Sequence, residues 1–238
     1  MCRGVDTKFG GGVVEINPWI ALGAFVVTGL LLLAVLWPTE ANGRRLLTKW
    51  GVAEPSAEQV AEGVRYLKRR RVLYPWLYAV LWLVPKWGDD VDQFVVVVLT
   101  GTLLAELLAL RPRLGARREA LLTPRGLFDI ASRWVLLSYA VFVGGAAVHL
   151  VIHPRWTALA WLAGSVLAVG LIVWAAVTRP ADGDHAADMA LRTRSVHVAA
   201  GLGVAVVGGL VHPWIGILGL LMWAAMANTA PRTAKIDR

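Results

Sequence analysis

Apolar residues occur in seven long runs, separated by segments that hold most of the charged residues. The runs cover residues 18–37, 72–88, 94–110, 134–152, 157–178, 196–211 and 214–228. The first has 20 residues without a charge. A helix of that length, rising about 1.5 Å per residue, crosses a hydrocarbon core of about 30 Å. The pattern therefore predicts an all-α, polytopic helical membrane protein with about seven transmembrane helices.

Two of the runs are weaker candidates for membrane spans. The distribution of charged residues indicates whether they cross. Run 72–88 contains Pro75, Pro85 and Lys86, and run 214–228 is short for a span. If all seven cross, 20 Lys and Arg residues lie on one side and 4 on the other. The positive-inside rule demands such an excess, whereas a re-entrant 72–88 would export the arginines of 111–133. We therefore predict an outside N-terminus and a cytoplasmic C-terminus.

A weak internal repeat accompanies these runs. Arg71, Arg133 and Arg194 each precede an outward run, and turns with proline and tryptophan follow at 85–87, 154–156 and 213–214. This pattern indicates one leading helix and three helical hairpins. Because tryptophan favours the membrane interface and proline ends helices, unrelated hairpin tips would look the same, so both explanations stay open.

Composition agrees with a membrane protein. The chain is 57% hydrophobic and only 17% charged, with a mean hydropathy of +0.60, unlike a soluble domain. The net charge of +8 lies beside apolar runs, so we predict membrane lipids and no nucleic acid as partners. Its 19 arginines against 5 lysines are typical of a GC-rich bacterial genome and indicate a bacterial inner membrane. In this usage and in segment 66–71 the chain resembles multispan proteins of actinobacteria, a likeness that implies no activity.

Residues 38–71 form the most structured polar segment of what we expect to be a single integral membrane domain over residues 1–238. Ser56 and Gln59 have the spacing of a capping box, and Val60, Val64 and Leu67 recur on one helical face. This predicts a short amphipathic helix on the cytoplasmic side. It ends in five positive charges, Arg65, Lys68, Arg69, Arg70 and Arg71. These favour binding of anionic lipid or an acidic protein partner, but they would equally serve as topology determinants and interfacial anchors.

Glu106 is the one acidic residue well inside an apolar run. An acid within a membrane span is a functional hypothesis by default, because burying a charge in lipid is costly. As a transport relay, Glu106 would pair with a polar group on another helix. As a structural feature, it would pair with Arg111 or Arg113 or reach toward water.

Three histidines suggest a metal or haem site. His149 and His153 lie on one helical face, and His212 ends another run before a proline. Imidazoles near the outer surface suit zinc, copper or the iron of a haem b. Without carboxylates placed to support them, we predict no cofactor and keep haem b or a metal ion as the alternative.

Small residues indicate close helix packing near the C-terminus. Gly201, Ala205 and Gly209 recur every fourth residue, and Gly216 and Gly219 follow the turn, so two backbones can approach closely in lipid.

No catalytic signature is present, so we do not expect an enzyme. The sequence favours a non-enzymatic multispan inner-membrane component that binds a protein partner or anionic lipid through its basic cytoplasmic face. The alternatives are a small transporter or channel using Glu106 and a redox protein using His149, His153 and His212.

Overall fold

A computed structural model describes residues 18–35, 37–83, 90–110, 118–119, 126–179, 181–182 and 184–229. Its helices are α1 (Pro18–Val35), α2 (Glu40–Lys49), α3 (Ala57–Val72), α4 (Tyr74–Trp82), α5 (Asp90–Ala109), α6 (Leu127–Ile130), α7 (Arg133–Ile152), α8 (Trp156–Thr178), α9 (His185–Val211) and α10 (Pro213–Asn228). Two-residue strands β1 (Arg118–Glu119) and β2 (Ala181–Asp182) pair antiparallel. The prediction of an all-helical fold is confirmed.

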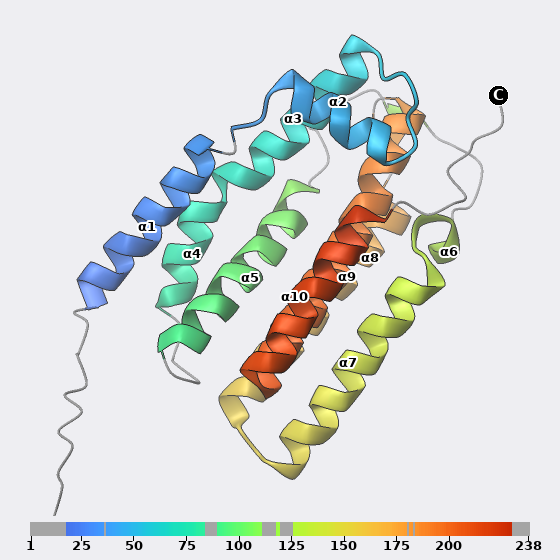
Figure 1. Cartoon of the computed structure of the whole chain (residues 1–238). Helices are drawn as coiled ribbons and strands as arrows, with labels where there is room; N and C mark the ends of the chain where they lie inside the picture. Colours follow the sequence, from blue (N-terminus) through green and yellow to red (C-terminus); the bar gives the residue numbers. More distant parts are fainter. Residues whose placement is uncertain are drawn as a thin grey trace, which may run out of the picture.

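Helix α9 lies at the centre of the bundle. Helices α5, α7, α8 and α10 all pack against it, α4 packs on α5, and α1 packs on α4 at the edge (Figure 1). The α2–α3 pair lies across one end of the long helices (Figure 1). This arrangement brings α3, α5 and α9 together at that end.

Within the described residues, three helices, α7, α8 and α9, are each long and apolar enough to cross a membrane, fewer than the seven spans expected. A fourth counts if the bent pair of α1 and α2 is one span. Helix α4 falls short because its nine residues extend only about 14 Å. Residues 84–88 of the same apolar run lie outside the described residues.

The outer faces of several helices are apolar. Large hydrophobic side chains are exposed along α1, α7, α8 and α10, among them Trp19, Trp134, Trp174 and Trp214. Water-soluble monomers rarely expose apolar surface of this extent. These helices are therefore compatible with a membrane location.

Helix α9 begins earlier than the apolar run 196–211 suggests. Asp184 caps it by accepting hydrogen bonds from the backbone N–H groups of Ala186 and Ala187, and the helix continues through a charged first third. The charged turns remain helical because their side chains, among them Asp188 and Arg192, find partners inside the protein. The apolar run marks only the later part of this helix, because residues 185–195 carry too many polar side chains to show as an apolar run.

The expected amphipathic helix is confirmed as α3. The Ser56 hydroxyl accepts from the backbone N–H of Gln59, and the Gln59 side chain accepts from the backbone N–H of Ser56. Val60 and Leu67 are buried, and Arg65 on the opposite face is exposed. The capping box therefore defines the start of α3 and sets which residues point into the protein.

The expected close approach of α9 and α10 is also present. A Cβ atom added to Gly219 would lie 2.7 Å from the Ala205 Cα, and one added to Gly201 would lie 2.8 Å from the Trp223 Cα. Backbone atoms meet at these points, so no side chain fits between the helices.

We predict that Gly219→Ala destabilises the protein by about 1–3 kcal/mol, because the new methyl group must push two backbones apart. Gly164→Ala is the matched control, since nothing lies within 4 Å of a Cβ added there. Thermal unfolding in detergent should show a lower Tm for Gly219→Ala than for Gly164→Ala. Equal Tm values for the two variants would contradict the close packing.

Candidate functional site

The strongest candidate site is a buried polar cluster where α3, α5 and α9 meet. Tyr66 and Arg70 lie one turn apart on the inward face of α3, Glu106 lies in the last turn of α5, and Arg194 and Ser195 come from the charged third of α9. The Glu106 side chain is fully buried. We refer to these five residues as the Glu106 cluster.

The Glu106 carboxylate is engaged at both oxygens. Arg70 Nε lies 2.9 Å from Oε2 as an ion pair, and Ser195 Oγ donates to Oε1 over 2.6 Å. The Tyr66 hydroxyl also donates to Oε1. Arg194 Nη1 in turn donates to the Tyr66 hydroxyl oxygen over 2.7 Å, and it lies 4.0 Å from Oε1. The carboxylate is thus neutralised from two helices at once.

Tyr66 and Arg70, the two members of the cluster on α3, are held in defined protonation states. Burial raises the pKa of the Tyr66 hydroxyl well above its usual range, so the phenol keeps the proton that it donates. Burial by itself would lower the pKa of Arg70, but the negative charge of Glu106 outweighs it and raises the pKa above its usual value. Arg70 therefore remains a cation although it is buried.

Glu106 thus finds a partner that the sequence did not identify. The side chain does not reach water, and Arg111 and Arg113, named as possible partners, lie outside the described residues. The spacing of Tyr66 and Arg70, four residues apart on an amphipathic helix, is the signal that could have pointed to α3. Ser195 gave no signal because it lies just before the apolar run 196–211 and belongs to no motif.

A second buried network stabilises the start of α9. Asp188 accepts from Arg179 and from Arg192, each over 2.7 Å. Arg192 is fully buried and donates from Nη1 to the backbone oxygens of Ala176 and Arg179 at the end of α8. Arg179 Nη1 donates to the Leu110 oxygen after α5. These arginines supply donors to carbonyl groups that a helix end leaves unpaired, so the network fastens three helices together.

The five basic residues singled out on α3 divide into two groups. Arg65, Lys68 and Arg69 are exposed and form what we call the basic face. Arg70 instead points inward to Glu106, and Arg71 is half-buried. Lys68 Nζ lies 5.6 Å from the centre of the Trp37 ring, a cation–π contact at the end of α1. Three of the five basic residues are therefore exposed on the surface of the protein.

The three histidines are not gathered into one site. The rings of His149 and His153 lie 5.0 Å apart at the end of α7, whereas His212 Nδ1 accepts from the backbone N–H of Trp214. Among the described residues, no three His, Cys, Asp or Glu side chains are grouped to hold a metal ion. A haem or metal site stays a prediction from the sequence alone.

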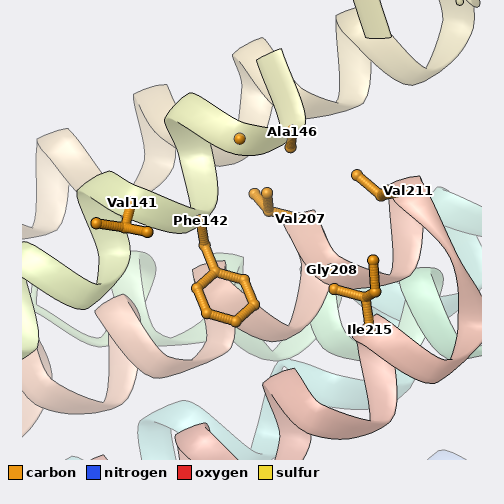
Figure 2. Close-up of a pocket in the computed structure, with 8 residues that line it drawn as sticks. Val141, Phe142, Ala146, Val207, Gly208, Val211 and Ile215 are labelled. Atoms are coloured by element: carbon orange, nitrogen blue, oxygen red, sulfur yellow. The ribbon is translucent and has the colours of Figure 1, made fainter. Parts of the chain in front are cut away.

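A cavity of about 340 Å³ lies between α7, α9 and α10 (Figure 2). Figure 2 shows its lining side chains, which include Val141, Phe142, Ala146, Val207, Val211 and Ile215. The described residues around it are apolar or glycine. Such a cavity offers no group to orient a polar ligand or to move a proton, so it is not a candidate active site.

We predict that Glu106→Gln destabilises the protein by about 3–5 kcal/mol, because it leaves Arg70 buried without its counter-charge. Unfolding in mixed detergent micelles should show this loss. The double variant Glu106→Gln with Arg70→Gln should be more stable than Glu106→Gln alone, since neither charge remains. A Glu106→Gln variant as stable as the wild type would show that the ion pair contributes nothing.

Comparisons with known proteins give no further guide to the site. No family model matches the chain, and neither a curated protein nor a solved structure matches it. The function has to be argued from the geometry of the described residues.

Proposed function

We propose that this protein is a non-enzymatic, multispan component of a bacterial inner membrane that binds an anionic partner, an acidic protein or anionic lipid, through its basic face. The observation that carries the proposal is that the basic residues of α3 divide into an exposed group and an inward-facing one. Arg65, Lys68 and Arg69 are exposed at the end of the bundle, while the adjacent Arg70 is committed to Glu106. The exposed group presents its charge to the surroundings of the bundle, whereas the charge of Arg70 is directed to Glu106.

The arrangement of the helices is compatible with a seven-span crossing in which α4, too short to cross by itself, forms part of the second span. Helices α1, α4, α5, α7, α8, α9 and α10 run in the same general direction side by side, with the polar α2–α3 pair at one end (Figure 1). With the 20 to 4 distribution of Lys and Arg, the positive-inside rule puts α2 and α3 in the cytoplasm. The N-terminus then lies outside and the C-terminus inside.

The basic face is suited to electrostatic binding at that surface. Each Lys or Arg near an anionic leaflet contributes about 1 kcal/mol, and the same charges attract an acidic protein. Trp37 beside Lys68 is a residue type that favours the headgroup region. The basic face therefore lies at the depth where lipid headgroups and cytoplasmic partners are both within reach.

The contacts of Glu106 favour this proposal over transport. A relay acid must exchange its proton or cation partner during each cycle. Glu106 is instead held by Arg70, Tyr66 and Ser195 together, and its side chain has no exposed area. This environment is typical of a structural ion pair.

The test is tagged purification from the native host in mild detergent, with mass spectrometry of the proteins and lipids that co-elute. We predict that neutralising the basic face with Arg65→Gln, Lys68→Gln and Arg69→Gln weakens partner binding roughly 100-fold, from about 1 kcal/mol per charge. The variant should keep its orientation, because 17 basic residues remain inside against 4 outside.

The matched control neutralises two exposed acids in the same segment, Glu54→Gln and Glu58→Gln. Removing negative charge should leave binding of an anionic partner equal or stronger. If the basic-face variant retains every partner of the wild type, the proposal fails.

A further inference from the structure

The apolar cavity of Figure 2 lies between two helices that pack on the same neighbour but not on each other. Helices α7 and α10 both pack against α9, and within the described residues they make few contacts with one another. Gly145 of α7 borders the cavity, and a Cβ atom added to it has nothing within 4 Å. A side chain at position 145 would therefore enter open space.

The cavity has a buried floor, half-buried walls and an exposed mouth. Val207 and Ala146 at the floor are 0% and 3% exposed. Phe142 and Ile215 form half-buried walls from α7 and α10 (Figure 2). Val141, at the mouth, is 63% exposed. The cavity is thus continuous with the apolar outer surface of the bundle.

The lining of the cavity suits an apolar occupant. An ordered water needs about 2–4 polar partners, and the described lining residues are apolar or glycine. The volume of about 340 Å³ is more than twice that of an apolar cavity of about 150 Å³ that stays dry and binds benzene. Left empty, the cavity would deprive its lining of dispersion contacts, and in lipid these contacts are a main source of packing energy.

The depth of the cavity indicates which apolar group reaches it. Val141 and Ala146 follow Arg133, the first residue of α7, by about 12 and 20 Å along the helix. The 20 residues of α7 extend about 30 Å, the thickness of the hydrocarbon core. In a bilayer the mouth therefore lies near the middle of the span, at the level of acyl chains and away from the headgroups.

The cavity is also short along the helix axis. Its lining on α9 extends from Val207 to Val211, about 6 Å of helix. A helix bound in a groove contacts it through positions about seven residues apart, about 10 Å along its axis. A space this short fits a slender hydrocarbon chain better than a partner helix.

We propose that this cavity holds an acyl chain of a membrane phospholipid, which enters between α7 and α10 from the hydrocarbon core. The site goes beyond binding at the basic face and shares with it only the membrane location. Its specificity is for the hydrocarbon chain, because the described lining offers no group that would recognise a headgroup.

The experiment uses the full-length protein in phosphatidylcholine vesicles that contain a small fraction of phosphatidylcholine with a diazirine in the middle of one acyl chain. After illumination, peptide mass spectrometry locates the attached lipid. We expect attachment at Val207 as well as at exposed residues of α7. Because Val207 is fully buried, only a chain inside the cavity reaches it. Attachment at exposed residues with none at Val207 would overturn the proposal.

We predict that Gly145→Leu lowers attachment at Val207 about tenfold, because the leucine side chain takes the space of the acyl chain. Tenfold corresponds to about 1.4 kcal/mol, the contribution of roughly ten carbon–carbon contacts. Gly144→Leu is the matched control. It adds the same side chain at the next position of α7, where a Cβ atom also has nothing within 4 Å, and Gly144 does not line the cavity.

Three results would contradict the site. Attachment at Val207 equal to wild type in Gly145→Leu is the first, and an equal loss in Gly144→Leu is the second. The third is a wild type that is dimeric and a Gly145→Leu variant that is monomeric in detergent, since a second copy of the chain would then fill the cavity. Should Gly145→Leu fail to fold, Gly145→Val adds a smaller side chain and should lower attachment in the same direction.

The basic-face variant, with glutamine at positions 65, 68 and 69, separates this inference from the proposed function. If that variant retains every partner while Gly145→Leu loses attachment at Val207, the proposed function fails and the acyl-chain site stands. If the basic-face variant loses its partners while Gly145→Leu keeps attachment at Val207, the acyl-chain site fails by itself.

Discussion

The burial of α9 is the constraint on which the rest of the structure depends. Four helices surround it, so nearly every side chain of α9 must fit against protein. Its apolar two thirds meet this requirement with small residues, which let α10 approach to backbone contact at Gly201 and Gly219. Its charged third cannot be satisfied by shape alone, because each buried charge needs an opposite charge and hydrogen bonds.

Two networks meet that second requirement along the charged start of α9. Asp188 and Arg192 connect it to the ends of α5 and α8, partly through backbone carbonyl groups. Ser195 and Arg194 connect it to α3 and α5 around Glu106. The polar end of α9 therefore determines where α3 lies, and through α3 it determines which basic residues remain exposed. The basic face thus consists of the α3 residues that remain exposed when Arg70 turns inward to neutralise the buried charge of Glu106.

Hydrophobic periodicity predicted the apolar helices well and their polar contacts poorly. Run 134–152 agrees with α7 to within one residue, and the capping box at Ser56 marked the start of α3, because both depend on local sequence. The partners of Glu106 could not be predicted, since Arg70 and Ser195 are brought to it only by the packing of three helices. For the same reason the five basic residues of α3 looked equivalent in sequence.

Arg70 and Arg71 show how adjacent residues of one type acquire different roles. A turn of 100° per residue directs Arg70 to the carboxylate of Glu106, where it is neutralised, and leaves Arg71 half-buried on another flank of α3. Because Glu106 is buried, it needs a counter-charge inside the protein, and the register of α3 decides which of its arginines supplies that charge. The role of each basic residue on α3 therefore follows from where the helix meets one buried acid, and not from its place in the sequence run.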